Sequence, residues 1–530
     1  MKLGPAAIAL LVLLSITACG GNPPQIVDYS PERGAKDVST ALPIRLTFDH
    51  DVDMRSVESR LHLVPATAGR PVWTNARQLA YEHPTLAPNT MYQVVLEAGY
   101  KDPEGNTALL RHHWSFLTEG PPTLAGSTPG NSEAGVDPAA YLVLNFSRDM
   151  AAASLSSAIT IAPSAPFSVR LDPADGRRAI IAPAALLQSG TSYTIAVASA
   201  ATDADGNQLA SSASITFTTG AVRQLRHWIA FTTAGADGAA GALWIVDESG
   251  FPRKLFNGEP VSAFSWSPGG DRLLVQGIDG GWSALTPGSD PSPLGFKAAW
   301  AAALTSGLGY VYIDDAGALH HRSQGGADSV IAKDISVATV APGGGRIAFV
   351  EVRSGSQVIW GYDVGLQARY QLAVEDSPIS GISWSPAGNR IAYLRLDGGT
   401  TSVRVRNLTG AGATTTVADG TGIGAPAWLP DSVHLVFAAA VPTSTGTLVK
   451  AFVLSIIAPP TALTPALGMP AESTVSVANP VPSPDGHQIA FLSHNQVWLM
   501  NADGTRPTPL TAFDPDSFPY SCRTPAWTRA

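Results

Sequence analysis

Apolar and polar positions alternate over short stretches of this chain, and one such stretch recurs through its second half. In Ser383–Leu394 the sequence Ser-Trp-Ser-Pro-Ala-Gly-Asn-Arg is followed by the apolar run Ile-Ala-Tyr-Leu. Proline presets φ for a turn, and Gly or Asn takes the position that needs positive φ. The pattern therefore predicts a strand that ends near Trp384, a tight turn and a second strand.

The spacing of further copies predicts the architecture of this half. These copies lie at residues 265–275, 341–349, 427–431 and 482–491. Pro342, Pro386 and Pro430 follow one another at intervals of 44 residues, and Pro484 follows after 54, which indicates an insertion of about ten. A period in the forties with about four strands per unit is typical of a β-propeller.

One repeat has lost its turn motif. Pro268 and Pro342 are 74 residues apart, which leaves room for two short repeats. We assign the hidden repeat to Lys297–Ala332, where Gly309–Ile313 still supplies an apolar strand.

The two ends of this region complement each other. Pro525–Thr528 reads as the first strand of a repeat with nothing after it, and His227–Phe231 as a second strand with nothing before it. Ile229 precedes Leu273 by the same period of 44 residues. We therefore expect the last strand to complete the first blade and close the ring, and we count seven blades.

These repeats resemble the WD-repeat-like blades of the TolB family of periplasmic propellers, whose pattern is Trp-Ser-Pro-Asp-Gly-x-x-Ile-Ala-Phe. The resemblance covers roughly 226–530 and implies a β-propeller there. The α/β domain of TolB is absent, and two β-domains precede the repeats instead. Partners known for TolB are therefore not transferred to this chain.

The first half contains two tandem copies of a β-domain, at 23–120 and 121–220. Apolar residues alternate with polar ones in both copies, and the copies align at offsets of 98 and 101 residues. The matching positions include Ile44, Leu46 and Phe48 with Leu142, Leu144 and Phe146, and Tyr92, Asn106 and Phe116 with Tyr193, Asn207 and Phe217. Several short strands in about 100 residues indicate immunoglobulin-like sandwiches.

Phe48–Met54 and Phe146–Met150 resemble the Phe-Ser-x-x-Met feature of the SbsA-type Ig-like domain of bacterial surface and envelope proteins. Leu86–Tyr92 resembles a tyrosine corner, which is a structural lock. The joining segments Glu119–Pro122 and Gly220–Arg226 are short, so we expect semi-rigid spacers. The expected fold class is thus all-β: two tandem Ig-like sandwiches followed by a seven-bladed β-propeller.

Residues 1–19 have the pattern of a targeting segment. Lys2 precedes the short apolar run Ala6–Leu14, and Ile16–Cys19 resembles the lipobox of bacterial lipoproteins. This resemblance implies that Cys19 carries lipid and anchors the protein to a membrane; the alternative is an ordinary secretory signal. Gly20 after the cysteine favours the outer membrane, so we expect a lipid-anchored protein of the cell envelope or cell surface.

Composition limits the partners. Of 530 residues 14% are charged, while 51 Gly and 42 Pro indicate a turn-rich β-protein. The net charge of −9 and the lack of a basic stripe argue against nucleic acid. The sequence suggests no cofactor. Cys522 is the second of two cysteines; we expect a buried residue in the closing blade rather than a reactive thiol.

Several residue groups suggest chemistry but have a simpler interpretation. Asp203–Asn207 resembles part of a calcium loop, yet the downstream bidentate Glu is missing, which favours a hairpin turn. The pairs His112–His113 and His320–His321 point to opposite strand faces and cannot chelate as units. Neither a Gly-x-Ser-x-Gly elbow nor a sialidase box occurs.

Two functional hypotheses remain. The first is a non-enzymatic, lipid-anchored binding or scaffold protein whose propeller engages a protein or glycan; the second is a propeller enzyme that acts on extracellular glycans or peptides. Clustered acids in the central channel would favour the second. We place the binding surface on the propeller face with the inter-blade loops. Part of the insertion falls between Ala466 and Ser476, and the candidate binding loop there consists of Leu467, Gly468, Met469, Pro470, Ala471, Glu472, Ser473 and Thr474. The alternative is a tolerated surface insertion, because a longer loop costs little free energy.

Overall fold

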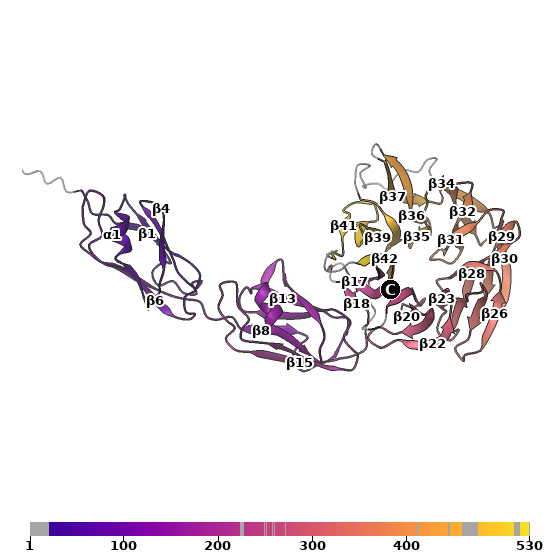
Figure 1. Ribbon diagram of the computed structural model, residues 1–530, viewed down its shortest axis with the longest axis horizontal. Coiled ribbons are helices and arrows are strands. Elements are labelled where there is room, and N and C mark those ends of the chain that lie inside the picture. The colour runs from indigo at the N-terminus through magenta and orange to yellow at the C-terminus, as the bar shows by residue number, and fades with distance from the viewer. Residues whose placement is uncertain are drawn as a thin grey trace, which may run out of the picture.

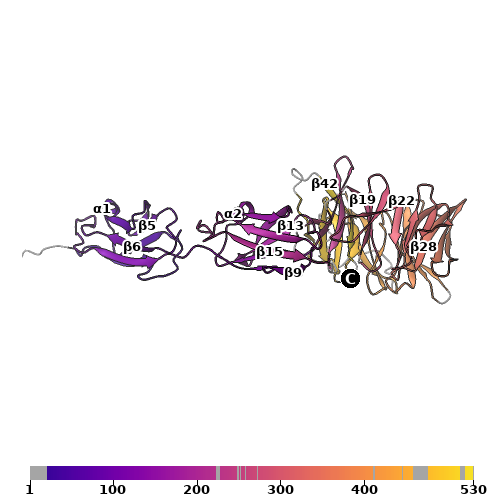
Figure 2. The same cartoon turned by 90° about the horizontal axis from the view of Figure 1, so that it is seen from below.

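The computed structural model describes residues 21–222, 227–247, 250, 252–256, 258, 260–270, 272–409, 412–443, 446–457, 475–513 and 520–528. These residues form two β-sandwiches in line and a ring of β-sheets, which together give an elongated molecule (Figures 1 and 2). Within these ranges no helix has the length and apolar character needed to cross a membrane.

The first sandwich packs a four-stranded sheet, in the order β1-β2-β5-β4, on a three-stranded sheet, β3-β6-β7. Asp53 caps its short helix by accepting a hydrogen bond from Ser56 N. The elements are β1 (Ile26–Ser30), β2 (Ile44–Phe48), α1 (Met54–Glu58), β3 (Leu61–Val64), β4 (Arg70–Asn75), β5 (Gln78–Glu82), β6 (Met91–Leu96) and β7 (His112–Leu117).

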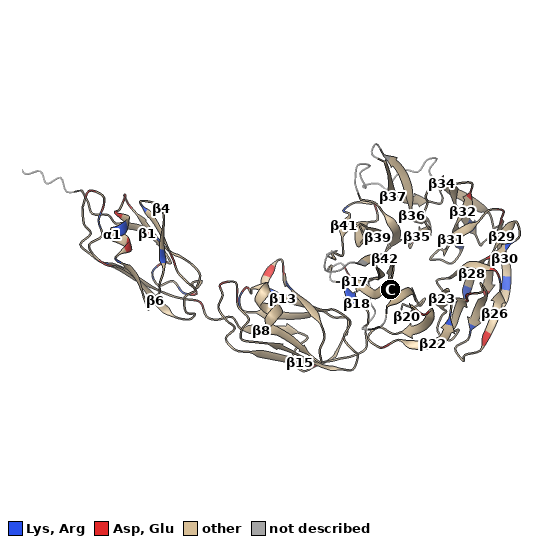
Figure 3. Cartoon of the chain, in the orientation of Figure 1, with Lys and Arg blue, Asp and Glu red and all other residues tan. Residues whose placement is uncertain are grey.

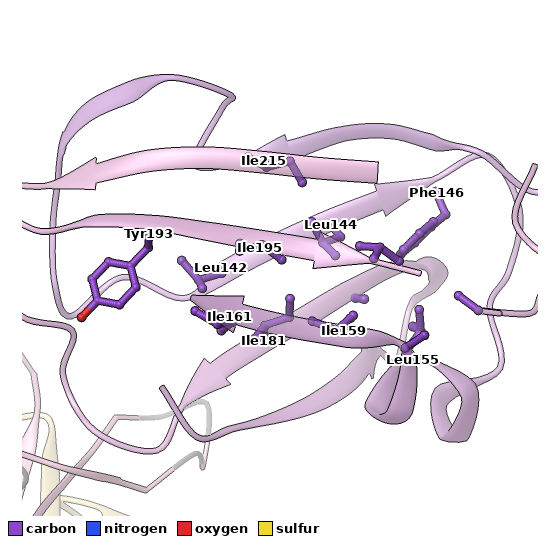
Figure 4. Packing of buried hydrophobic residues seen from close by; sticks show 14 of the residues in the cluster. Leu142, Leu144, Phe146, Leu155, Ile159, Ile161, Ile181, Tyr193, Ile195 and Ile215 are labelled. Atoms are coloured by element: carbon purple, nitrogen blue, oxygen red, sulfur yellow. The ribbon is translucent and has the colours of Figure 1, made fainter. Parts of the chain in front are cut away.

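The second sandwich has the sheets β12-β13-β10-β8 and β11-β14-β15-β9. Figure 4 shows its core, where Leu142, Leu144 and Phe146 of one sheet face Tyr193 and Ile195 of the other. The elements are β8 (Leu124–Thr128), β9 (Glu133–Val136), β10 (Leu142–Phe146), α2 (Ala152–Ala158), β11 (Ile159–Ala162), β12 (Phe167–Asp172), β13 (Asp175–Pro183), β14 (Ser192–Val197) and β15 (Ala213–Thr219).

Both sandwiches follow the alternation seen in the sequence. Ile44, Leu46 and Phe48 are buried on one side of β2, and Arg45 between them is exposed. The tyrosine corner is confirmed, because Ala87 N donates a hydrogen bond to Tyr92 Oη at 3.1 Å. The equivalent bond in the second sandwich joins Gln188 N to Tyr193 Oη, also at 3.1 Å.

The third region is a ring of antiparallel sheets around a central axis (Figure 1), which confirms the predicted β-propeller. The sheets, each written from its inner to its outer strand, are β42-β16-β17-β18, β19-β20-β21-β22, β23-β24-β25-β26, β27-β28-β29-β30, β31-β32-β33-β34, β35-β36-β37 and β38-β39-β40-β41. The count of seven blades stays a prediction, because residues 458–474 and 514–519 lie outside the described ranges.

The bounds of the propeller strands follow in chain order. They are β16 (Ile229–Gly235), β17 (Ala240–Val246), β18 (Arg253–Lys254), β19 (Val261–Trp266), β20 (Leu273–Gly277), β21 (Gly281–Leu285), β22 (Ser292–Lys297), β23 (Trp300–Ala303), β24 (Tyr310–Ile313), β25 (Leu319–Arg322), β26 (Asp328–Ala332), β27 (Ile335–Val340), β28 (Arg346–Arg353) and β29 (Ser356–Asp363). The remaining strands are β30 (Ala368–Glu375), β31 (Ile379–Trp384), β32 (Arg390–Asp397), β33 (Thr400–Asn407), β34 (Thr414–Gly420), β35 (Ala427–Trp428), β36 (His434–Thr443), β37 (Gly446–Ser455), β38 (Ala478–Pro482), β39 (Gln488–Ser493), β40 (Gln496–Asn501), β41 (Thr508–Pro509) and β42 (Tyr520–Trp527).

The Ser-Trp-Ser motif of the β31–β34 blade ties this blade to both of its neighbours. Ser383 Oγ donates to Pro426 O in the following blade at 2.9 Å. The indole of Trp384 donates to Thr339 O in the preceding blade at 3.4 Å. Ser385 Oγ accepts a hydrogen bond from Arg390 N at 3.0 Å and closes the turn. The motif thus holds the following blade, the preceding blade and its own turn in place.

The C-terminal strand closes the ring as predicted. Strand β42 pairs antiparallel with β16, which places Trp527 opposite Ile229. The indole of Trp527 also donates to Val481 O of the preceding blade at 2.9 Å. The first and last strands of the propeller therefore share one sheet.

A buried polar contact joins the two sandwiches. Glu119 Oε2 accepts a hydrogen bond from Arg148 at 2.6 Å, and Glu119 Oε1 accepts one from Asn207 at 3.1 Å. Thr40 Oγ1 of the first sandwich donates to Asn207 Oδ1 at 2.9 Å, and Arg148 also pairs with Asp37. Burial raises the pKa of Glu119 to about 7, and the opposing charge of Arg148 limits this increase. We call this group the sandwich junction.

The second sandwich docks on the side of the ring. The guanidinium carbon of Arg253 in β18 lies 4.5 Å from the ring centroid of Tyr141 and 4.8 Å from that of Trp228. Leu186 of the sandwich joins the same apolar cluster as Leu255 of the propeller. The joint leaves a cavity of about 360 Å³, lined by Leu186, Leu187, Gln188, Ser189, Leu255, Phe256, Gly288, Ser289 and Asp290.

Candidate functional site

The propeller has two faces that differ in their connections. One face carries the Pro/Gly turns between the first and second strands, such as 385–389. The other carries the hairpins between second and third strands, such as 398–399, and the crossings between blades, such as 376–378. We call the second one the hairpin face. The docked sandwich uses a turn on the opposite face, because Ser189 N donates to Gly288 O at 3.2 Å.

The β27–β30 and β31–β34 blades extend furthest toward the hairpin face among the four-stranded blades. Strands β28 and β32 have eight residues each, whereas β20 has five and β24 has four. The ends of the long strands expose Val352, Val374 and Leu396, at 42%, 51% and 41%. These three exposed aliphatic side chains, with charged groups on the same face, mark a candidate contact surface for a macromolecule.

A buried ion pair network fastens these two blades together at the same face. Glu375 in β30 is 6% exposed and accepts hydrogen bonds from Arg404 Nη1 at 2.6 and 2.7 Å. Tyr393 Oη in β32 donates to Glu375 Oε1 at 2.5 Å. Arg395 Nε lies 3.3 Å from Glu375 Oε2 and bonds the exposed Asp376 and Asp397. Through Arg395 the network connects the buried Glu375 with the exposed Asp376 and Asp397.

The surroundings of the network keep two of its groups in fixed protonation states. Burial and the bond to Glu375 raise the pKa of Tyr393, so its hydroxyl keeps its proton near neutral pH. The hydrogen bond from Arg395 lowers the pKa of Asp376, which therefore stays ionised. The network therefore presents the ionised Asp376 at the hairpin face.

The inner strands line the central channel with small and hydroxyl-bearing residues. In their described ranges they contain one charged residue, Arg523 of β42. Figure 3 shows more of the charged positions on the outer strands, such as β26 and β30. Clustered acids, which would have favoured an enzyme, are not found in the inner strands as far as the structure describes them.

Two predicted sites lie outside the described residues. These are Cys19 and the candidate binding loop Leu467–Thr474. Cys522 is described: it is 3% exposed in the closing sheet, and burial raises the pKa of its thiol to about 11. The expectation of a buried cysteine at this position is confirmed.

His320 and His321 make separate contacts. His320 contacts Asp314 through Nε2 at 3.0 Å and Asp328 through Nδ1 at 3.1 Å, while His321 Nε2 contacts Leu308 O at 2.8 Å. His320 also stacks on Tyr312, with ring centroids 4.6 Å apart. Among the described residues no three His, Cys, Asp or Glu side chains come together as a metal ion would require.

The turn Asp203–Asn207 forms a hairpin turn, as expected, but it has a further role. Asn207 N donates to Asp203 Oδ1 at 2.8 Å within the turn, and Asn207 also reaches Glu119 and Thr40 at the sandwich junction. The sequence did not reveal this role, because Glu119 precedes Asn207 by 88 residues.

The Glu375 network was also missed, although the sequence contains one signal. Tyr393 occupies a position at which Phe231, Phe349, Phe437 and Phe491 stand in other repeats. A hydroxyl at a fully buried position needs a hydrogen-bond partner. The tyrosine in place of phenylalanine therefore indicates a buried polar partner in or beside the β31–β34 blade.

Comparison with family models supports the two predicted Ig-like sandwiches. A family model described as a bacterial Ig-like domain matches residues 21–118 and 119–219. The comparison with curated proteins found no match.

Three solved structures have a limited similarity to this chain. TolB from Acinetobacter baumannii is 14% identical with a TM-score of 0.38, over 72% of this chain and 86% of that one. A putative TolB from Agrobacterium tumefaciens is 17% identical with a TM-score of 0.35, over 57% and 99%. An oligogalacturonate lyase in complex with manganese is 12% identical with a TM-score of 0.40, over 54% and 85%. Residues 21–118 and 119–219 thus match a bacterial Ig-like domain, and the strands described after them form a β-propeller.

Proposed function

We propose that this protein is a non-enzymatic, lipid-anchored binding protein of the cell envelope or cell surface. Its two sandwiches form a stalk, and its propeller engages a protein or glycan. The observation that carries the proposal is the docking of the second sandwich on the ring through Arg253, Tyr141 and Trp228. A shared apolar cluster at this joint gives the propeller a fixed position at the end of the stalk.

The anchor in this proposal is Cys19, which follows a lipobox-like tetrapeptide. The substitution Cys19→Ala should move the protein from the membrane fraction to the soluble fraction. Metabolic labelling with a radioactive fatty acid should mark the parent and not the variant. Continued membrane retention of an unlabelled variant would contradict lipid anchoring.

The binding surface in this proposal is the hairpin face near Val352, Val374 and Leu396. Its mixture of aliphatic and ionised groups suits a folded protein or a glycan with polar and apolar faces. The candidate binding loop Leu467–Thr474 belongs to the same proposal, because it lies where the sequence crosses from one blade to the next.

Two features support a binding role over catalysis. The carboxylate of Glu375 is committed to Arg404, Arg395 and Tyr393. Both ring nitrogens of His320 are committed to carboxylates. These hydrogen bonds give Glu375 and His320 a structural role, so no substrate is needed to explain why the two side chains are there.

Affinity capture from envelope extracts tests the binding surface. A form of the protein that begins at residue 23, without the anchor, should capture a partner. The triple substitution of Val352, Val374 and Leu396 by Ser should abolish this capture. Leu366→Ser is the matched control, because Leu366 is 77% exposed but lies at a turn on the opposite face. In a parallel variant, a Gly-Ser link replaces Leu467–Thr474.

If Leu366→Ser reduced capture as much as the triple substitution, the loss of any exposed leucine or valine would be enough, and the hairpin face would not be the binding surface. Undiminished capture by both the triple variant and the shortened loop would remove this face from the site. Capture by the 23–220 fragment alone would overturn the assignment of binding to the propeller.

A further inference from the structure

The first sandwich exposes an apolar pair at its N-terminal end. Leu109 and Leu110 are 83% and 77% exposed. Among the large hydrophobic side chains that are exposed in the described residues, they are the one pair of chain neighbours. Arg111, which follows them, is exposed too.

The fold does not require leucine at these positions. The second sandwich repeats the first at an offset of 101 residues in this segment, and it has Ala210 and Ser211 in their place. There, Ala210 N donates to Pro122 O at 2.9 Å, and the domain forms the same hairpin turn. The apolar pair is therefore specific to the first sandwich.

The chain enters the molecule at the same end. A Cβ atom on Gly21 would lie 2.7 Å from Asn106 Nδ2, so the first described residue rests against the hairpin that precedes the leucines. Gln25 N also donates to Asp49 Oδ1 at 2.9 Å and holds the entering segment to this end. Leu109 follows Asn106 by three residues, which limits their separation to about 10 Å.

The distance to the membrane follows from the chain length. Cys19 precedes Gly21 by two residues, which span at most about 7 Å. If Cys19 carries lipid, as the proposed function has it, this end of the sandwich lies against the headgroups. An aliphatic pair followed by an arginine suits the boundary between acyl chains and anionic headgroups.

We propose that Leu109 and Leu110 insert into the bilayer surface that holds the acylated Cys19. This second contact fixes the angle of the stalk to the membrane, so that the propeller stands at a defined height. The inference rests on the proposed lipid anchor for its native setting. The partner of this surface is the lipid bilayer, and the side chains of the two leucines make the contact with it.

An environment-sensitive dye tests the contact. In a chain that begins at Gly20 with an added N-terminal His tag, Leu110→Cys is labelled with an NBD fluorophore. The buried thiol of Cys522 stays unlabelled in the folded protein. Vesicles of phosphatidylethanolamine and phosphatidylglycerol with a nickel-chelating lipid bring this end to a bilayer without acylation. The matched control is Leu366→Cys, which is 77% exposed on the propeller.

The expected result is a blue shift of the NBD emission at position 110 on tethering, with quenching by a nitroxide lipid, and no change at position 366. No shift at position 110 would overturn the proposal. A shift that grows with protein concentration in the absence of vesicles would also overturn it, because a second copy would then cover the leucines.

A second variant separates insertion from folding. Leu109→Ala with Leu110→Ser copies the second sandwich and should fold normally. The native acylated protein with this change should stay in the membrane, but alkaline carbonate should extract more of it than of the parent. Equal extraction of both would overturn the proposal. Because the vesicle experiment needs no acylation, failure of the lipid anchor and failure of the leucine contact give different results.

Discussion

Ile229 lies opposite Trp527 in the closing sheet of the propeller, although the two residues belong to opposite ends of the domain. Next to them, Trp228 O accepts a hydrogen bond from Thr528 N at 2.8 Å across 300 residues of chain. The ring is thus fastened by its first and last strands. Its stability depends on a contact that forms when both ends are in place.

Removal of the C-terminal half of the last strand should open the ring. Deletion of 524–530 should lower the melting temperature of the propeller markedly, as measured by calorimetry. Trp527→Ala should cost about 3 to 5 kcal/mol, because a buried indole and its hydrogen bond to Val481 are lost. Arg523→Ala, at an exposed position of the same strand, is the control. An unchanged melting curve after the deletion would refute ring closure by β42.

The charge of Glu375 should matter more than that of its neighbour. Glu375→Gln leaves Arg404 and Arg395 without their shared buried partner and should destabilise the propeller by about 3 kcal/mol. We expect the low end of the range for buried pairs, because both arginines keep some access to water. Asp376→Asn, at a side chain that is 80% exposed, should change stability far less than Glu375→Gln, because solvent screens an exposed ion pair. Urea unfolding measures both, and equal effects would contradict the network.

The sandwich junction should weaken as pH rises. The pKa of Glu119 is about 7 in the folded protein against an ordinary value of 4.5, so the folded state binds more protons than the unfolded chain between these values. The contribution of this group to stability therefore falls as pH rises through this window. Calorimetry of the sandwich transition at about pH 5 and about pH 8 should show this decrease in the parent. Glu119→Gln should reduce it, and an identical pH dependence in the variant would assign it to other groups.

Cys522 should report the opening of the closing sheet. Burial raises the pKa of its thiol to about 11, so it should not react with iodoacetamide at about pH 8 in the folded protein. Labelling should become complete once urea unfolds the propeller. In Trp527→Ala, labelling should begin at a lower urea concentration than in the parent. Rapid labelling of the native parent would show that the thiol is accessible.

The repeat architecture could be predicted from the sequence because its determinants are local. Alternation of buried and exposed positions is set by the two-residue period of a strand, as in Ile44, Leu46 and Phe48. The turn residues around Pro386 recur at a fixed spacing, and the half repeats at Ile229 and Trp527 complement each other. These signals predicted both sandwiches, the propeller and the strand that closes it.

The contacts that join these units were decided by the tertiary structure. Glu375 meets Arg404 across 29 residues, Glu119 meets Asn207 across 88, and Arg253 meets Ala139 across 114. None of these separations follows a period, and each pair forms because two separately folded sheets or domains come together. The alternation along a strand specifies which of its residues are buried. It does not specify which charged group of another strand or domain will lie against them. That choice depends on how complete domains pack, which no local pattern encodes.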